Sequence, residues 1–181
     1  STGPALLKRV EHWTSWLDGG KEGPWTRYVW QPMRKRFDAY MASREQRIKA
    51  LRDIIKGIDL PTEAIDAPEL GTQTFKSTAE LLGAMLHMGN ESNLQKLLGG
   101  YGWGARMADG TVDTTGWWRL MDRLMKSGRI TKAHVDALQS MWDLMEDLKG
   151  EAQQVNRSLY GTYFEEIQAQ PFETPWGRYK G

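Results

Sequence analysis

A short polar run, HMGNESNLQKLLGG from His87 to Gly100, contains the residue types that most often carry out chemistry. His87 and Glu91 lie four positions apart, so on one continuous helix they would share a face and could bind a metal ion or relay a proton. A metal site needs further ligands, and the zinc-protease pattern His-Glu-x-x-His does not occur in the chain. His87 and Glu91 are therefore a possible polar site, and we assign no metal and no cofactor to it.

The same run also predicts a corner between two helices. Gly89 can adopt a positive φ and end a helix over residues 78–88 as its C-cap. Asn90 or Ser92 can then cap a second short helix, because their side-chain oxygens accept N–H groups of its first turn. Asn93 is placed to bond the backbone at this junction, and the closing glycine pair ends the second helix. The residues expected to form this structural corner are Gly89, Asn90, Asn93, Gly99 and Gly100.

An enzymatic alternative rests on Glu91. The pair Glu91-Ser92 resembles the Glu-Ser pair of lysozyme-like transglycosylases, in which a buried glutamic acid protonates the glycosidic oxygen. The Gly-Leu-Met-Gln segment that such enzymes carry further along is missing from this chain. A peptidoglycan-cleaving domain with Glu91 as its acid stays an alternative, while the leading expectation is that the chain is not an enzyme.

A basic segment suggests a second alternative, binding to nucleic acid. Residues 24–58 contain nine basic and three acidic side chains, although the whole chain carries a net charge of only +1. Basic side chains neutralise phosphates, and Trp25, Tyr28 or Trp30 could stack on bases. The low net charge favours a solvated helix face instead, or one that meets the acidic residues 136–166. The candidate nucleic-acid contacts are Arg34, Lys35, Arg36, Arg44 and Arg47.

Hydrophobic periodicity predicts an all-α fold, an irregular bundle of about five or six helices. Pro32 lies inside the second helical stretch and should kink or split it. The segment TQTFKS is the one plausible strand, so we expect at most one short strand or hairpin. No apolar run approaches the ~20 residues that cross a bilayer. Besides the short helix at the corner, the stretches with helical spacing are 6–17, 24–57, 78–88, 115–127 and 131–160.

The length suits one helical domain over residues 1–170, followed by an extended tail over 171–181 that leads into the rest of a longer chain. The first residues lack the basic and apolar regions of a signal peptide. The chain has no cysteine, which excludes disulfides and thiolate metal sites. It has nine tryptophans, whose large rings can fill gaps between helices. Those expected in the core are Trp25, Trp103, Trp117 and Trp142.

Three segments together resemble a known protein family. GPWTRYVWQPMRKR enters the long basic helix, LLGAMLHMGNESNLQKLLGG contains the corner, and ETPWGRYKG lies at the end of the sequence. This combination is similar to the large polyvalent proteins of tailed phages and prophages, which are often described by a PLxRFG domain. A Gly-Asn-x-x-Asn-x-x-Lys-Leu-Leu segment lies in a helical region of such proteins, and here it begins at Gly89.

The resemblance implies an internal helical region of a virion-borne protein that enters the host with the phage DNA. Such proteins string enzymatic modules along helical spacers, and this chain carries no motif of those modules. The implied role is a non-enzymatic structural or interaction module. Its expected partners are other domains of the same large protein or virion proteins, and its expected location is the virion and then the host cytoplasm.

Overall fold

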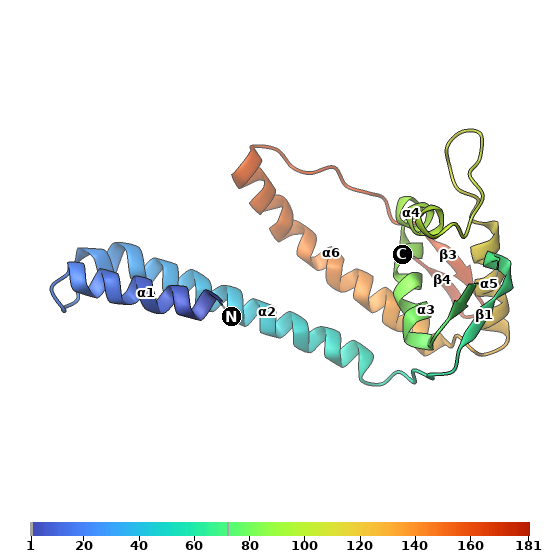
Figure 1. The fold of residues 1–181 in the computed structure, drawn as a ribbon, viewed down its shortest axis with the longest axis horizontal. Coiled ribbons are helices and arrows are strands. Elements are labelled where there is room, and N and C mark those ends of the chain that lie inside the picture. The colour runs from blue at the N-terminus through green and yellow to red at the C-terminus, as the bar shows by residue number, and fades with distance from the viewer. Residues whose placement is uncertain (1, 72) are drawn as a thin grey trace. The chain divides into compact units, whose positions relative to one another are not determined.

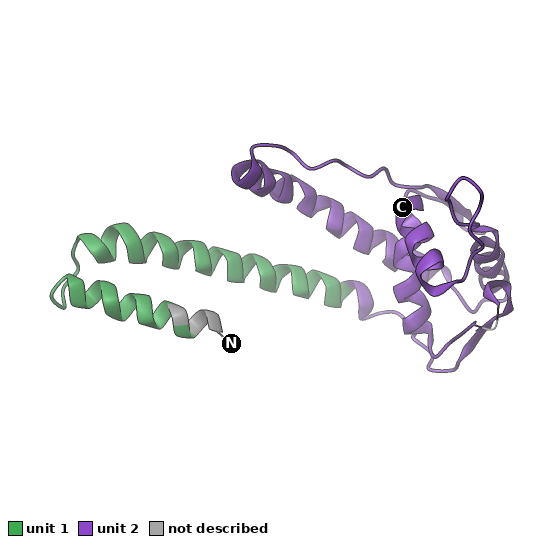
Figure 2. Cartoon of the chain, turned by 45° about the horizontal axis from the view of Figure 1, so that its top comes forward, with its two compact units in different colours: residues 1–53 green, residues 54–181 purple. Residues whose placement is uncertain are grey.

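The chain folds into two compact units. The computed structural model describes residues 2–71 and 73–181. Unit 1 comprises residues 1–53 and unit 2 comprises residues 54–181 (Figure 2). The sequence predicts one helical domain over residues 1–170, and the structure divides these residues between two compact units.

Helices dominate both units, which confirms the predicted all-α class (Figure 1). In the described residues they are accompanied by two short antiparallel strand pairs. None of the described helices is long and apolar enough to cross a membrane. The α-helices of the described residues are α1 (Thr2–Leu17), α2 (Gln31–Ile55), α3 (Thr78–Met85), α4 (Glu91–Tyr101), α5 (Thr115–Lys126) and α6 (Lys132–Tyr160).

Asp18 organises the loop that joins the two helices of unit 1. Its carboxylate accepts hydrogen bonds from the backbone N–H groups of Gly23, Trp25 and Thr26, at N···O distances of 3.2, 3.0 and 2.6 Å. The first N–H groups of a helix have no partner inside the helix and need an acceptor from outside. Asp18 supplies that acceptor from the end of α1, so the loop has a defined conformation.

The second helical segment of unit 1 begins with a wide turn. Residues Thr26–Trp30 form a π-helical turn, η1, in which the N–H of Gln31 bonds to the carbonyl of Thr26. Pro32 comes directly after Gln31, and in a regular α-helix its ring would collide with the carbonyl of Tyr28. A π turn widens the helix at this point. The irregularity predicted at Pro32 therefore takes the form of a wide turn just before it.

Unit 1 buries few side chains. Among those described, only Thr14 and Trp30 are buried. The Arg34 guanidinium lies 5.7 Å from the centroid of the Trp30 ring, a cation–π arrangement. Trp25, which the sequence places in the core, is half exposed. The apolar side chains of this unit therefore lie mostly at its surface, since two helices alone cannot enclose them.

Unit 2 contains the main hydrophobic core. Trp117 is completely buried on α5, Trp142 is buried on α6, and Trp103 packs against the cluster from the loop after α4. The predicted core positions of these three tryptophans are thereby confirmed. The other fully buried large side chains are Phe75, Leu81, Met85, Met88, Leu94, Leu98, Leu120, Met121, Leu124, Ile130 and Leu138.

A small hairpin precedes α3. Strands β1 (Ile65–Ala67) and β2 (Gln73–Phe75) pair antiparallel, and η2 (Pro68–Leu70) is a 3-10 turn between them. The strand predicted in TQTFKS is confirmed as β2. Glu69 in η2 accepts a hydrogen bond of 2.6 Å from Arg123 on α5, and this bond lowers the pKa of the Glu69 carboxyl. The hairpin is therefore fixed to α5 by an ion pair as well as by its apolar residues.

Side-chain caps start two helices where the sequence places them. The Ser77 hydroxyl accepts the N–H of Glu80 at the start of α3. Thr131 and His134 form a capping box at the start of α6, in which His134 Nδ1 accepts the Thr131 N–H at 3.1 Å. His134 Nε2 therefore carries the ring hydrogen and donates a hydrogen bond of 2.6 Å to the Asp59 carbonyl. This buried histidine has a structural role.

The last residues form a hairpin instead of the extended tail that the sequence predicts. Strands β3 (Phe172–Thr174) and β4 (Gly177–Tyr179) pair antiparallel, with Phe172 opposite Tyr179. The two rings are stacked with centroids 5.8 Å apart. The Tyr179 hydroxyl donates a 2.6 Å hydrogen bond to Asp136 on α6. Burial, with this bond to a carboxylate, raises the pKa of Tyr179 to about 12.

Candidate functional site

The corner between α3 and α4 is built around Asn90. A 3-10 turn, η3 (Leu86–Gly89), follows α3, and Asn90 is the N-cap of α4. The Asn90 side-chain oxygen accepts the Asn93 N–H at 3.0 Å, and its amide nitrogen donates to the Gln168 carbonyl at 2.8 Å. One side chain therefore starts α4 and holds a segment that lies 78 residues further along the chain.

Gly89 differs from the expected C-cap, because its backbone does not have a positive φ. The reason for a glycine here is space. A Cβ atom at this position would lie 2.6 Å from Cε2 of Trp142 on α6. The Trp142 ring is held there by a hydrogen bond of 3.0 Å from its Nε1 to the Leu86 carbonyl. The corner and α6 thus approach each other at Gly89, where the residue has no side chain.

The closing glycine pair also has a different role from the predicted one. Gly99 and Gly100 lie inside α4, and Gly102, with a φ of +71°, ends this helix as its left-handed cap. A Cβ at Gly99 would lie 3.1 Å from Val112, so this glycine lets the loop after α4 pack closely. Gly100 faces open space, and nothing in the structure explains a glycine there.

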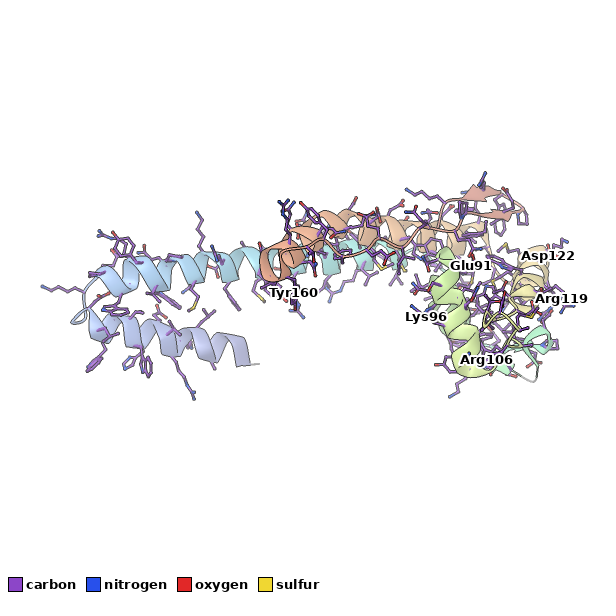
Figure 3. The ribbon with its side chains drawn as sticks, turned by 90° about the horizontal axis from the view of Figure 1, so that it is seen from above. Glu91, Lys96, Arg106, Arg119, Asp122 and Tyr160 are labelled. Atoms are coloured by element: carbon purple, nitrogen blue, oxygen red, sulfur yellow. The ribbon has the colours of Figure 1, made fainter. Side chains whose placement is uncertain are left out.

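His87 and Glu91 are not brought together into one site. The helix is interrupted between them, since Asn90 has an extended backbone. His87 borders a hollow of about 240 Å³ beside Phe75 and Trp103. Glu91 borders a different hollow, of about 480 Å³, beside Lys96 and Arg106 (Figure 3).

The surroundings of Glu91 also differ from those of a catalytic acid. Its side chain is exposed in the first turn of α4 and accepts a hydrogen bond of 3.2 Å from Gln95. A glutamic acid that protonates a leaving group at neutral pH needs an apolar environment. No group of three or more metal-binding side chains gathers anywhere in the described parts of the chain.

A larger hollow, of about 670 Å³, lies between the corner, α6 and the segment that follows α6. Its charged residues are occupied by one another: Lys149 pairs with Glu146 and, at 3.0 Å, with Glu166. The hydrogen bond from Lys149 lowers the pKa of Glu166. Because these charged groups are already paired with one another, the hollow is better suited to binding apolar side chains than to proton transfer. The apolar lining consists of Leu86, Trp142, Met145, Leu148, Phe164 and Ile167.

One wall of this hollow is an extended segment, residues 161–170, that sequence reasoning missed. Gln153 on α6 binds it through both atoms of its side-chain amide. The amide oxygen accepts the Phe164 N–H at 2.9 Å, and the amide nitrogen donates to the Phe164 carbonyl at 3.0 Å. Asn156 donates to the Thr162 carbonyl at 2.7 Å. Gln153 is a polar residue with a buried side chain, and this burial is a property of the fold that the sequence does not show.

The candidate nucleic-acid contacts all lie on α2, and Arg34 is already paired. Its Nε atom lies 3.3 Å from an Asp38 carboxylate oxygen, and its guanidinium lies over Trp30. Trp30 is buried, so it is not available to stack on a base. Trp25 and Tyr28 are exposed. The other four candidates, which share this helix, are Lys35, Arg36, Arg44 and Arg47.

Comparisons with protein-family profiles, with curated proteins and with solved structures find no match to this chain. The interpretation of the site therefore rests on the geometry of the chain itself. That geometry shows structural hydrogen bonds at the corner and apolar surfaces elsewhere.

Asn90→Ala is expected to lower the free energy of unfolding of unit 2 by about 1–2 kcal/mol. The change removes a helix cap and the bond to Gln168, and each contributes about 1 kcal/mol. Asn93→Ala is the matched control, because Asn93 contributes its backbone N–H to this bond and alanine keeps that group. The free energy of unfolding of this variant should fall by no more than about 0.5 kcal/mol. Urea denaturation of both variants measures the difference. Equal losses would contradict this account of the corner.

Proposed function

We propose that the chain is a non-enzymatic interaction module that binds another helix along the second half of α2. The observation that carries the proposal is an apolar stripe on this half that unit 1 leaves exposed. Ile48 and Leu51 are 36% and 41% exposed, and Met41, seven residues before Ile48, is 39% exposed. Their spacing of seven and three residues places these three side chains on one face of the helix. Within unit 1, α1 runs beside only the first half of α2 (Figures 1 and 2).

A face of this kind suits the helix-in-groove mode of recognition, in which apolar anchors at helical spacing insert into a groove. The basic side chains around the stripe favour an acidic partner, since opposite charges speed association and select the partner. The resemblance of three segments to large polyvalent phage proteins supports the same role. On that view the partner belongs to the same large protein or to the virion.

The proposal predicts that the stripe contributes nothing to the stability of the chain alone. Ile48→Ser and Leu51→Ser together should change the free energy of unfolding by less than about 0.5 kcal/mol, as surface substitutions do. The same double change should reduce the fluorescence of a dye that binds exposed apolar surface.

Phe37→Ser is the matched control, because Phe37 is partly buried on the first half of α2. We expect it to destabilise unit 1, and helicity measured by circular dichroism during urea denaturation reports the loss. If the double change on the stripe destabilised the chain by more than about 1 kcal/mol, the stripe would belong to the core of the chain and the proposal would fail.

A further inference from the structure

The closed end of unit 1 carries a second exposed surface, distinct from the stripe on α2. We call residues 13–29 the hairpin tip; they comprise the end of α1, the loop and most of η1. Six large apolar or aromatic side chains of the tip are between 42% and 74% exposed. They are Trp13, Trp16, Leu17, Trp25, Tyr28 and Val29.

The first three of these residues point away from the interior of the hairpin. Trp13, Trp16 and Leu17 are spaced by three and one residues, which places them on one flank of α1. Thr14, between them in sequence, is the residue that faces inward and is buried. Folding of unit 1 therefore does not require the rings of Trp13 and Trp16, and their exposure needs another explanation.

The hairpin tip is also ordered, and its two basic and two acidic residues leave it without a net charge of its own, so the positive charge near it comes from the rest of unit 1. Asp18 and Glu22 are its acidic residues, and both bind groups of the chain itself: Asp18 binds three backbone N–H groups, and Glu22 accepts a hydrogen bond from Gln31. Unit 1 as a whole has eleven basic and six acidic residues, a net charge of +5. Lys21 and Arg27 lie within the tip.

A hollow next to the tip combines apolar surface with positive charge. It has a volume of about 480 Å³ and is formed along α1. Val10 and Trp13 give it an apolar surface, and Lys8 and Arg9 bring positive charge to the same place. This combination suits a ligand with an anionic group attached to an apolar body.

We propose that the hairpin tip binds the surface of a membrane that contains anionic phospholipid. Tryptophan and tyrosine prefer the boundary between headgroups and acyl chains, because their rings are apolar with a polar atom. Basic residues near that surface each add about 1 kcal/mol of attraction to anionic lipid. The tip lies on the surface and does not span the bilayer.

Two features favour a lipid surface over nucleic acid and over a protein groove. Leu17 and Val29 have no aromatic face, so base stacking would leave them exposed. The six side chains are collected at a closed end of a hairpin, whereas a helix that fills a groove presents a stripe along its length. Membrane binding by the tip goes beyond the proposed function, since it uses different residues.

The experiment is sedimentation of the full chain with vesicles at low and moderate salt. Phosphatidylcholine vesicles are compared with vesicles that also contain phosphatidylglycerol. We expect the chain to sediment with the anionic vesicles, and to do so less at higher salt, because salt screens the attraction. Hydrogen exchange measured with and without these vesicles should show protection at residues 13–29.

Trp13→Ser with Trp16→Ser should weaken binding to the anionic vesicles by about tenfold or more, since burial of two indole rings is lost. Leu159→Ser with Tyr160→Ser is the matched control, because these side chains are 68% and 73% exposed. Figure 3 shows Tyr160 at the end of α6, in the other unit. This control should leave vesicle binding unchanged. Circular dichroism of both variants verifies that the helices are intact.

Three outcomes would overturn the proposal. The first is no sedimentation with anionic vesicles, and the second is equal binding by the wild type and the tip variant. The third is binding of single-stranded DNA that the tip variant loses while vesicles are not bound, which would assign the tip to nucleic acid. Failure here leaves the stripe on α2 untouched, because its test uses Ile48 and Leu51.

Discussion

Phe172→Ala is expected to lower the free energy of unfolding of unit 2 by about 3–5 kcal/mol, the usual cost of removing a buried phenylalanine ring. Phe172 is 6% exposed and belongs to the main hydrophobic cluster. Its ring centroid lies 6.0 Å from those of both Trp118 on α5 and Trp142 on α6. A single residue of the C-terminal hairpin thus joins two helices, and its removal leaves a cavity between them.

Tyr160→Ala is the control for this prediction. Tyr160 is an aromatic residue close to Phe172 in sequence, but it is 73% exposed at the end of α6. Its removal should cost less than about 0.5 kcal/mol. Equilibrium denaturation followed by near-ultraviolet circular dichroism reports the tertiary packing of unit 2. A loss below about 1 kcal/mol for Phe172→Ala would show that the hairpin is a dispensable tail.

The helices of this protein could be predicted from sequence because their signals are local. Ser77 and Thr131 begin helices, and Gly128 and Gly161 follow helix ends with positive φ. Each of these signals acts within about four residues, so a single sequence contains it completely. The predicted strand at Gln73–Phe75 is bounded in the same way by a glycine and a serine.

The C-terminal hairpin could not be predicted in this way, because what stabilises it is distant in sequence. The hydroxyl of Tyr179 binds Asp136, which lies 43 residues earlier, and Phe172 packs on α5 and α6. A two-stranded hairpin is marginal by itself, and tertiary packing decides whether it forms.

The exposed residues of unit 1 show a second limit. Spacing identified an apolar face on the second helix, and the residues do lie on one face. Periodicity cannot show what covers such a face, since a core and a binding surface have the same pattern. Trp25 illustrates the point, because a large ring predicted to be buried is half exposed. Whether an apolar helix face is covered depends on how many helices pack against it, and this number is a property of the fold.

The corner between α3 and α4 could be expected from the residue types around Asn90, but the contacts that hold it in place could not. Asn90 caps α4 as its residue type indicates, but its second bond goes to Gln168. Gly89 is important because of Trp142, which lies 53 positions further along the chain. His87 and Glu91 have the spacing of a functional pair, yet the cap at Asn90 separates them. Contacts across the fold replaced each local interpretation except the cap.

Gly89→Ala is expected to destabilise unit 2 by about 1–3 kcal/mol, the usual cost of adding an atom to a packed interior. The new Cβ would lie 2.6 Å from the Trp142 ring, closer than Cβ contacts in proteins allow. The ring cannot move freely, because its Nε1 atom donates to Leu86 and its edge meets Phe172. Either the corner or α6 has to shift.

Gly100→Ala provides the opposite expectation in the same short stretch of sequence. Gly100 is inside α4, its backbone is helical, and a Cβ there would meet nothing within 4 Å. Alanine should therefore stabilise the helix by about 0.5–1 kcal/mol, since glycine loses more backbone entropy on folding. Denaturation of both variants and of the wild type measures their free energies of unfolding and tests the two expectations together. A Gly89→Ala protein as stable as Gly100→Ala would mean that the corner and α6 do not meet at Trp142.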